Sequence, residues 1–179
     1  MTKIEKTIES RVVFQGPFFR IKDHLIEGAR QRRTHRLVLE HPGAACAIPV
    51  LPSGEVVMVR QFRKAIESFT LEFPAGKLEA GESPEECLRR ELEEEIAFRA
   101  ETIRPLISYY PAFGYSNEII HIYIATGLQP IERRGGDETY LEPATMPFPA
   151  VLEMIDRGRI RDSKTIIGAW AAARGGLLG

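Results

Sequence analysis

The sequence has few cysteines, almost no net charge and no long apolar run, and each of these shortages excludes a class of protein. Two cysteines, Cys46 and Cys87, are too few for a disulfide framework. The 24 basic and 25 acidic residues leave a formal net charge of −1, so neither nucleic acid nor an anionic membrane is expected as a partner. No apolar stretch reaches the length of a membrane span, and the first residues lack the apolar region of a signal peptide. We therefore expect a cytoplasmic protein.

The composition that remains is that of an ordinary globular domain. Hydrophobic residues make up 44% of the chain and charged residues 27%, and the 179 residues suffice for one domain with its own core. Residues 11–27 alternate around a Gly-Pro pair, which predicts a β-hairpin. Further strands are expected at 37–39, 44–51, 56–59, 69–73, 103–109 and 119–126, and helices at about 84–96, 149–157 and 163–173. This order of elements predicts an α/β fold.

The most informative stretch, residues 76–98, leads from a turn into a helix that carries several carboxylates on one face. Ser83 and Glu86 have the spacing of a capping box at the start of this helix. At about 100° per residue, one face then collects three acidic side chains, those of Glu91, Glu94 and Glu95. Leu88, Leu92 and Ile96 lie on the adjacent face, which we expect to pack on the core.

This acidic face conflicts with the ordinary preferences of a helix. Like charges three and four residues apart repel, and acidic residues near the C-terminus oppose the helix dipole. A hard cation such as Mg²⁺ would remove the conflict, because it takes oxygen ligands. The alternative is a solvated face with salt links to Arg89 and Arg90, which is the commoner role of a glutamate-rich helix.

The full spacing of this stretch resembles the Nudix box, G-x5-E-x7-R-E-U-x-E-E-x-G-U, in which U is a large apolar residue. Its fixed positions are occupied, in order, by Gly76, Glu82, Arg90, Glu91, Leu92, Glu94, Glu95 and Phe98. The single departure is Ala97, where the pattern has glycine. A left-handed cap is common just past a helix, so alanine there implies backbone strain or a different helix exit.

The flanking segments resemble the ADP-ribose pyrophosphatase branch of this family. The similar runs are residues 61–63, 71–77, 110–118 and 158–165, so the resemblance covers about residues 36–170. It implies a Nudix α/β/α sandwich with a mixed sheet over residues 41–179 and an N-terminal β-hairpin extension over residues 1–40. In this branch the extension crosses to a partner subunit, so the resemblance also implies a homodimer and substrate contacts from the extension.

The resemblance further implies a divalent metal site made of oxygen ligands. Glu91 and Glu95 match the main carboxylate ligands, and Glu94 matches a third ligand that binds directly or through water. The backbone carbonyl of Ala75 matches a further ligand. Hard donors of this kind suit Mg²⁺, with Mn²⁺ as the other candidate.

Other positions of the motif match structural or catalytic groups. Gly76 and Arg90 are expected to be structural. Glu82 either ties the loop to the helix through Arg90 or acts in catalysis, and Glu94 is a further candidate catalytic residue.

The box contains no obvious general base, and the family usually supplies one from a mobile loop. Glu138 is the best positional match, with Asp137 and Glu142 as rivals. The alternative is a flexible acidic surface loop.

Four residues match positions that contact substrate in this branch: Arg36, Gln61, Arg63 and Glu118. Arginine gives paired hydrogen bonds to phosphate or ribose oxygens, and glutamine can read a ribose or a base edge. The alternative for Arg63 is that it only decorates the end of a strand. The rest of the arginine-rich stretch at 30–36 is interpreted as a solvated loop or edge strand.

These residues predict a Mg²⁺-dependent hydrolase that converts ADP-ribose, a nucleoside diphosphate derivative, to AMP and ribose 5-phosphate. GDP-mannose, NADH and diadenosine polyphosphates are alternative substrates, because nothing in the chain fixes the base. A sensor that binds a nucleotide sugar without cutting it is a second class of function. The three acidic residues of the box argue against it, since such proteins commonly lose them.

Overall fold

The computed structural model describes residues 5–132 and 141–178 and divides the chain into two compact units. The first contains residues 1–43 and 110–119, and the second contains residues 44–109 and 120–179. The first unit therefore includes a segment from the middle of the chain in addition to the N-terminal strands. Within the described residues, no helix is long and apolar enough to cross a membrane.

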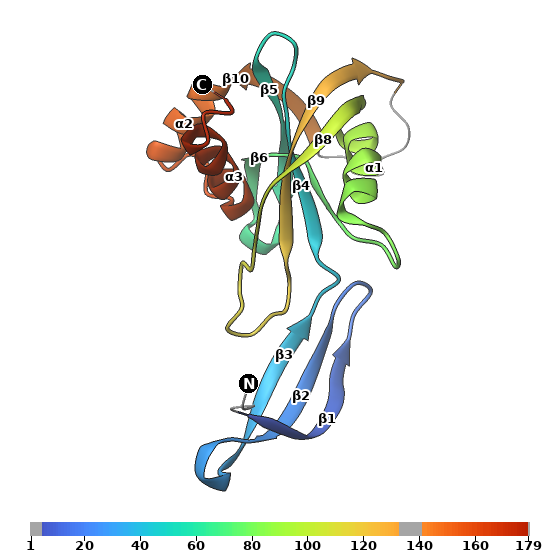
Figure 1. Cartoon of the computed structure of the whole chain (residues 1–179), viewed down its shortest axis with the longest axis vertical. Coiled ribbons are helices and arrows are strands. Elements are labelled where there is room, and N and C mark those ends of the chain that lie inside the picture. The colour runs from blue at the N-terminus through green and yellow to red at the C-terminus, as the bar shows by residue number, and fades with distance from the viewer. Residues whose placement is uncertain (1–4, 133–140, 179) are drawn as a thin grey trace. The chain divides into compact units, whose positions relative to one another are not determined.

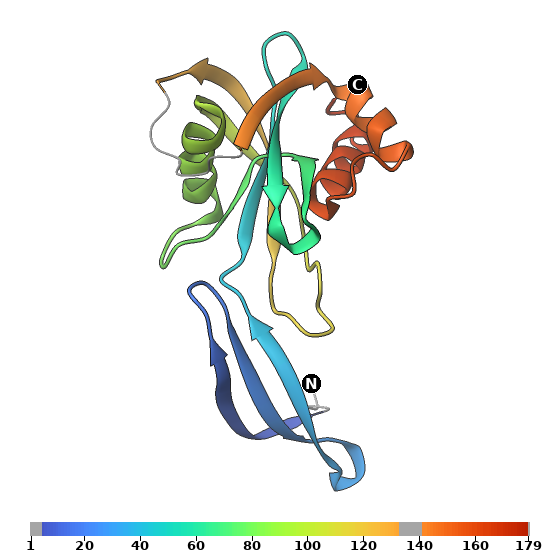
Figure 2. The ribbon, with the colours of Figure 1, turned by 180° about the vertical axis from the view of Figure 1, so that it is seen from behind.

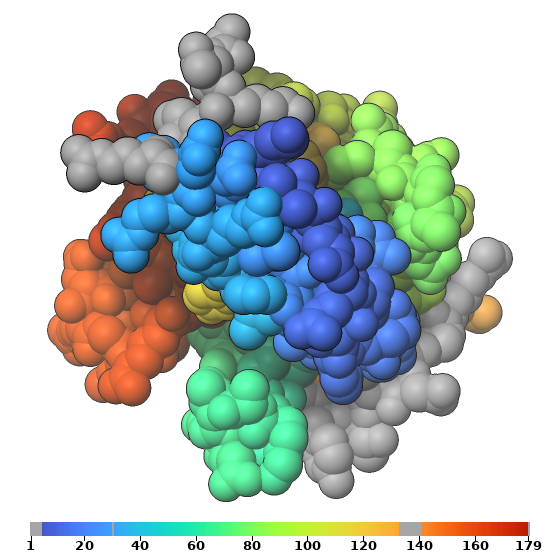
Figure 3. All heavy atoms as spheres, turned by 90° about the horizontal axis from the view of Figure 1, so that it is seen from below, coloured from blue at the N-terminus to red at the C-terminus, as the bar shows by residue number. Residues whose placement is uncertain are grey.

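The first unit is an antiparallel sheet with the strand order β1-β2-β3. Its elements are β1 (Lys6–Gln15), β2 (Arg20–Glu27), the short 3₁₀ helix η1 (Ala29–Gln31) and β3 (Arg33–Glu40). Gln15 pairs with Arg20 across the turn, which confirms the predicted hairpin. Every residue of β1 is exposed, and its side chains are visible in dark blue in Figure 3.

Residues 110–119 join this unit through backbone hydrogen bonds to the end of β3. Leu39 N–H donates to Tyr115 O at 2.8 Å, and Asn117 N–H donates to Leu39 O at 3.2 Å. The Asn117 side-chain oxygen also accepts from His41 N–H at 2.8 Å. A loop distant in sequence is thereby fixed to the sheet.

The second unit is built on two sheets. One has the order β7-β4-β9-β8 and consists of β4 (Ala44–Pro49), β7 (Ala75–Lys77), β8 (Phe98–Tyr109) and β9 (Ile120–Pro130). The other has the order β10-β5-β6 and consists of β5 (Glu55–Arg63), β6 (Ser68–Glu72) and β10 (Leu141–Pro147), with the 3₁₀ helix η2 (Lys64–Ile66) after β5. Strands β4 and β9 are parallel and the other pairs are antiparallel, which confirms the predicted mixed topology.

Helices cover both sides of these sheets. Figures 1 and 2 show α1 (Pro84–Ile96) on one side, and α2 (Phe148–Asp156) and α3 (Ser163–Arg174) on the other. Strand β5 serves both layers because its side chains alternate. Val56 and Met58 belong to the core under α2 and α3, whereas Val57 and Val59 belong to the core under α1. The predicted α/β/α sandwich is confirmed.

Strand β10 was not predicted from the sequence. It holds two prolines, Pro143 and Pro147, which argue against a strand because proline cannot donate to the ladder. The structure resolves this conflict by placing β10 at an edge of its sheet, where β5 is its one partner among the described strands. Strand β8 also begins at Phe98, five residues before the expected start at residue 103.

Helix α1 begins and ends as its sequence indicates. Ser83 accepts from the backbone of Glu86 while the Glu86 carboxylate accepts from Ser83 N–H, so the predicted capping box is present. At the other end Ala97 adopts φ 57° and ψ 40°, in the left-handed region that favours glycine. The strain expected from the departure at this position is therefore present.

We predict that Ala97→Gly raises the free energy of unfolding by about 1 kcal/mol, because it removes a Cβ from a left-handed residue. Urea denaturation measures the change. Ala171→Gly, in the interior of α3, is the matched control and should lower the free energy of unfolding by about 1 kcal/mol. A loss of stability in both variants would show that Ala97 is not strained.

Candidate active site

The loop before α1 approaches the helix closely at Gly76. A Cβ added to Gly76 would lie 1.7 Å from Glu91 Oε1, so only glycine leaves room for this carboxylate. The Glu91 side chain is 13% exposed. Burial raises the pKa of Glu91, and hydrogen bonding from Arg90 opposes that rise. The position of Gly76 in the motif thus has a steric cause.

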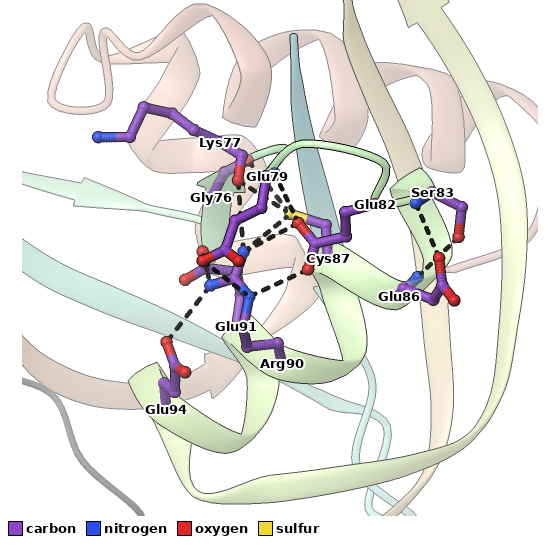
Figure 4. Close-up of polar contacts among 10 residues, drawn as sticks. All are labelled: Gly76, Lys77, Glu79, Glu82, Ser83, Glu86, Cys87, Arg90, Glu91 and Glu94. Carbon is purple, nitrogen blue, oxygen red and sulfur yellow. Dashed lines mark hydrogen bonds and ion pairs between the residues drawn. The ribbon is translucent and has the colours of Figure 1, made fainter. Parts of the chain in front are cut away.

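Arg90 connects this loop to the acidic face of α1, as Figure 4 shows. Its Nε and Nη2 donate to the two carboxylate oxygens of Glu82 at 3.0 and 3.2 Å. Its Nη1 donates to Glu91 Oε1 at 2.6 Å and to Glu94 Oε2 at 3.4 Å. The bond from Arg90 holds the pKa of Glu82 below its usual value. A single guanidinium therefore joins three acidic residues of the box.

Glu95 lies against the segment that enters the loop. Ala75 N–H donates to Glu95 Oε2 at 3.1 Å. Together with the contact between Gly76 and Glu91, this bond turns the acidic face of α1 toward the start of β7. The structure thus brings the predicted ligands Glu91 and Glu95 to the backbone of residues 75–76.

The acidic side chains of α1 do not form a preformed metal site. Within residues 5–132 and 141–178, no three histidine, cysteine, aspartate or glutamate side chains are arranged to hold a metal ion. Arg90 Nη1 is instead the cation beside Glu91 and Glu94. The donors fit a hard cation in their chemistry, because all are oxygens and Mg²⁺ usually keeps several waters beside one or two carboxylates. Glycine at position 76 lets the Glu91 carboxylate occupy the place that a Cβ would take.

Two of the predicted substrate residues, Gln61 and Arg63, lie two positions apart at the end of β5. Arg63 donates from Nε to Glu72 Oε1 at 2.8 Å and from Nη2 to Glu72 Oε2 at 2.6 Å. Hydrogen bonding to Glu72 raises the pKa of Arg63, and the charges of Asp162 and Glu95 add to this rise. Gln61 is buried, with 7% exposure.

Sequence reasoning missed Glu72 and its second partner, Lys164. Lys164 Nζ donates to Glu72 Oε2, and only 2% of Glu72 is exposed. Burial alone would raise the pKa of Glu72, but bonding from Arg63 and the charge of Lys164 lower it to about 2. The available signal was the presence of an acid and a lysine in two separate runs that resemble the ADP-ribose branch, at residues 71–77 and 158–165.

The remaining predicted residues lie elsewhere. Arg36 and Glu118 belong to the first unit. Arg36 Nη2 donates to Glu5 Oε1 at 3.0 Å, and Glu118 Oε1 lies 3.6 Å from His41 Nδ1. Glu138 lies outside the described residues.

Comparison with known proteins agrees with this geometry. The NUDIX domain model matches residues 40–166, so the chain belongs to the Nudix family. The methanol dehydrogenase activator of Bacillus methanolicus is 36% identical, over 91% of this chain and 89% of that protein. The ADP-ribose pyrophosphatase of Bacillus subtilis strain 168 is 32% identical, over 90% of this chain and 88% of that protein.

Two further proteins extend the comparison, one by sequence and one by structure. A GDP-mannose pyrophosphatase of Yersinia enterocolitica is 33% identical, over 76% of this chain and 75% of that protein. The crystal structure of an ADP compounds hydrolase superposes with a TM-score of 0.85 and 19% identity, covering 98% of this chain and 95% of that one, which shows the Nudix fold. The chain is thus a Nudix hydrolase related to ADP-ribose and GDP-mannose pyrophosphatases, and the predicted enzyme class, a pyrophosphohydrolase, is confirmed.

We predict that Gly76→Ala lowers the affinity for Mn²⁺ by about 10- to 100-fold, because the new Cβ must displace the Glu91 carboxylate. Calorimetric titration with Mn²⁺ measures the affinity. Gly28→Ala is the control, since the nearest atom to its added Cβ is 4.0 Å away. Equal affinities in the two variants would remove Glu91 from the metal site.

Proposed function

We propose that the protein hydrolyses the diphosphate bond of ADP-ribose in a Mg²⁺-dependent reaction that gives AMP and ribose 5-phosphate. The observation that carries this proposal is the acidic face of α1, held against residues 75–76 by Glu91 and Glu95. The similarity to a bacterial ADP-ribose pyrophosphatase over nine-tenths of the chain supports the choice of substrate.

In this proposal the metal is held by the carboxylates of Glu91 and Glu95 and the carbonyl of Ala75, with Glu94 as a third acid. Nudix enzymes generally use divalent metal ions, and Mn²⁺ is an alternative to Mg²⁺ here. The bound ion supplies neutralisation of diphosphate charge and a more acidic water. Arg90 and Glu82 keep the loop on the helix through their paired hydrogen bonds.

The substrate is proposed to contact Arg36, Gln61, Arg63 and Glu118. For Arg63 the support is its geometry, because its bonds to Glu72 use Nε and Nη2 and do not involve Nη1, which can donate to another acceptor. Its side chain is 42% exposed, so a dissolved anion can reach it. Phosphate oxygens are suitable acceptors for such a guanidinium.

Three other substrates and one other function are the alternatives to this proposal. The similarity to a GDP-mannose pyrophosphatase favours GDP-mannose as the main alternative. NADH and diadenosine polyphosphates are further diphosphate substrates. A sensor that binds without cutting is disfavoured because Glu91, Glu94 and Glu95 are all present.

We also propose a cytoplasmic homodimer in which the N-terminal strands meet a second copy. The support is the exposure of the apolar side chains of β1, those of Ile8, Val12, Val13 and Phe14. A monomeric mass in light scattering at working concentration would overturn this assembly.

A substrate panel tests the proposed reaction. Wild-type protein with Mg²⁺ should release AMP from ADP-ribose with a higher kcat/KM than for GDP-mannose, NADH or diadenosine polyphosphates. Glu91→Gln and Glu95→Gln should each lose most turnover while keeping the wild-type melting temperature within a few degrees, because they remove metal ligands from a face crowded with like charge. Tight binding of ADP-ribose without product release would favour the sensor instead.

Glu138 is proposed as the general base that takes a proton from the attacking water. Glu138→Gln should lower kcat by about 10²–10⁴-fold with little change in metal affinity, because the base acts on water and not on the resting ion. Glu142→Gln tests the rival base in the same assay, and because Glu142 is 69% exposed and pairs with Arg60 at 3.0 Å, its kcat should stay near the wild-type value. The assignment fails if kcat falls in the Glu142 variant alone.

A further inference from the structure

We propose that Glu72 and Lys164 are positioning residues, which hold the Arg63 guanidinium in the orientation that binds the anionic substrate. The proposal rests on the proposed function in one respect, namely that Arg63 contacts substrate. Neither Glu72 nor Lys164 needs to touch the substrate, because both act through Arg63.

The Glu72 carboxylate is saturated with donors. Its Oε1 accepts from Arg63 Nε at 2.8 Å and from Thr70 Oγ1 at 2.5 Å. Its Oε2 accepts from Arg63 Nη2 at 2.6 Å and from Lys164 Nζ. Four donors on two oxygens leave this carboxylate, which is buried at the end of β6, no room to rotate. Because Arg63 Nε and Nη2 both bond to this fixed carboxylate, the plane of the Arg63 guanidinium is fixed as well.

Lys164 is itself held in place by the first turn of α3. Its Nζ lies 3.0 Å from Asp162 Oδ1, and Asp162 caps the helix by accepting from Thr165 N–H at 3.0 Å. Thr165 Oγ1 accepts from Phe73 N–H at 2.9 Å. The start of α3 is thus tied to the residue that follows Glu72, so the lysine and the carboxylate cannot shift separately.

Stability alone does not explain this cluster. Two basic and two acidic side chains, those of Arg63, Lys164, Glu72 and Asp162, balance in charge, but the interior must desolvate Glu72 and Lys164, which are 2% and 8% exposed. Replacing such a pair by packed apolar residues is often neutral or stabilising. The buried charges orient the half-exposed Arg63, and an apolar replacement would remove that orientation.

A guanidinium ordered before binding loses less freedom when it meets a phosphate. Without Lys164, Glu72 keeps one fewer donor, and Arg63 becomes the only cation that neutralises it. The carboxylate can then rotate, and the Arg63 guanidinium bound to it is no longer held in one orientation. We therefore expect weaker substrate binding with little change in the chemical step.

A double-mutant cycle tests this coupling. Arg63→Ala should raise KM for ADP-ribose by about 10- to 100-fold, as expected for a lost charged hydrogen bond. Lys164→Met should raise KM about tenfold in the wild-type background, leave kcat within about twofold, and have no further effect in the Arg63→Ala background. An equal increase of KM in both backgrounds would overturn the proposal, because Lys164 would then act independently of Arg63.

Two variants complete the kinetic design. Lys64→Met is the matched surface control, because Lys64 follows Arg63, is 84% exposed and pairs with Glu67 at 2.6 Å. It should leave KM unchanged. If Lys164→Met does not fold, Thr70→Val replaces it in the cycle, since it removes one donor to Glu72 at nearly constant volume. Its effect on KM should likewise vanish in the Arg63→Ala background.

A binding measurement separates this inference from the proposed reaction. If the wild-type protein cuts no substrate of the panel, the proposed function fails, and the cycle is repeated by calorimetric titration with inorganic pyrophosphate. Nuclear magnetic resonance of the Arg63 Nε–H, assigned by its absence in Arg63→Lys, gives a readout without any ligand. Its exchange with water should be at least tenfold faster in Lys164→Met than in wild type. Unchanged exchange together with additive binding effects would overturn the positioning role.

Discussion

The close approach of a loop backbone to a helix side chain is the constraint on which the site depends. The Glu91 carboxylate lies where a side chain on residue 76 would be, so the loop and helix α1 fit only with glycine at that position. Arg90 then secures the contact, because its guanidinium reaches the loop acid Glu82 and the helix acids together. Glycine at position 76 and the shared counter-ion Arg90 together hold the carboxylates of the motif as one surface of oxygen donors.

Much of this could be predicted from the sequence, because the determinants were local. The capping box at Ser83 and Glu86 fixes where α1 begins, and the 3.6-residue period fixes which of its faces carries the acids. The strained turn at Ala97 was also foreseeable, since the motif has glycine there. The order of strands and helices predicted an α/β fold, and the resemblance to the Nudix box implied its α/β/α layers.

The sequence could not predict which residues far apart in the chain contact one another. Glu72 and Lys164 are 92 residues apart, and no periodicity links them, so their pairing required the fold. Strand β10 was not predicted because proline is tolerated mainly in an edge strand, and the sequence does not show which strands lie at an edge. The inclusion of residues 110–119 in the first unit likewise depends on backbone bonds to Leu39 that no local pattern encodes.

The alternation of side chains along β5 has a consequence for how such an enzyme can change. The helix with the acidic face packs on one core, whereas the helix that supports Arg63 packs on the other, and the sheet separates them. A substitution under α1 therefore perturbs the acidic face of that helix first, and a substitution under α3 perturbs the contacts of Arg63 first. The two groups of residues can therefore change independently in a lineage, so the acidic helix can stay unaltered while the surroundings of Arg63 change.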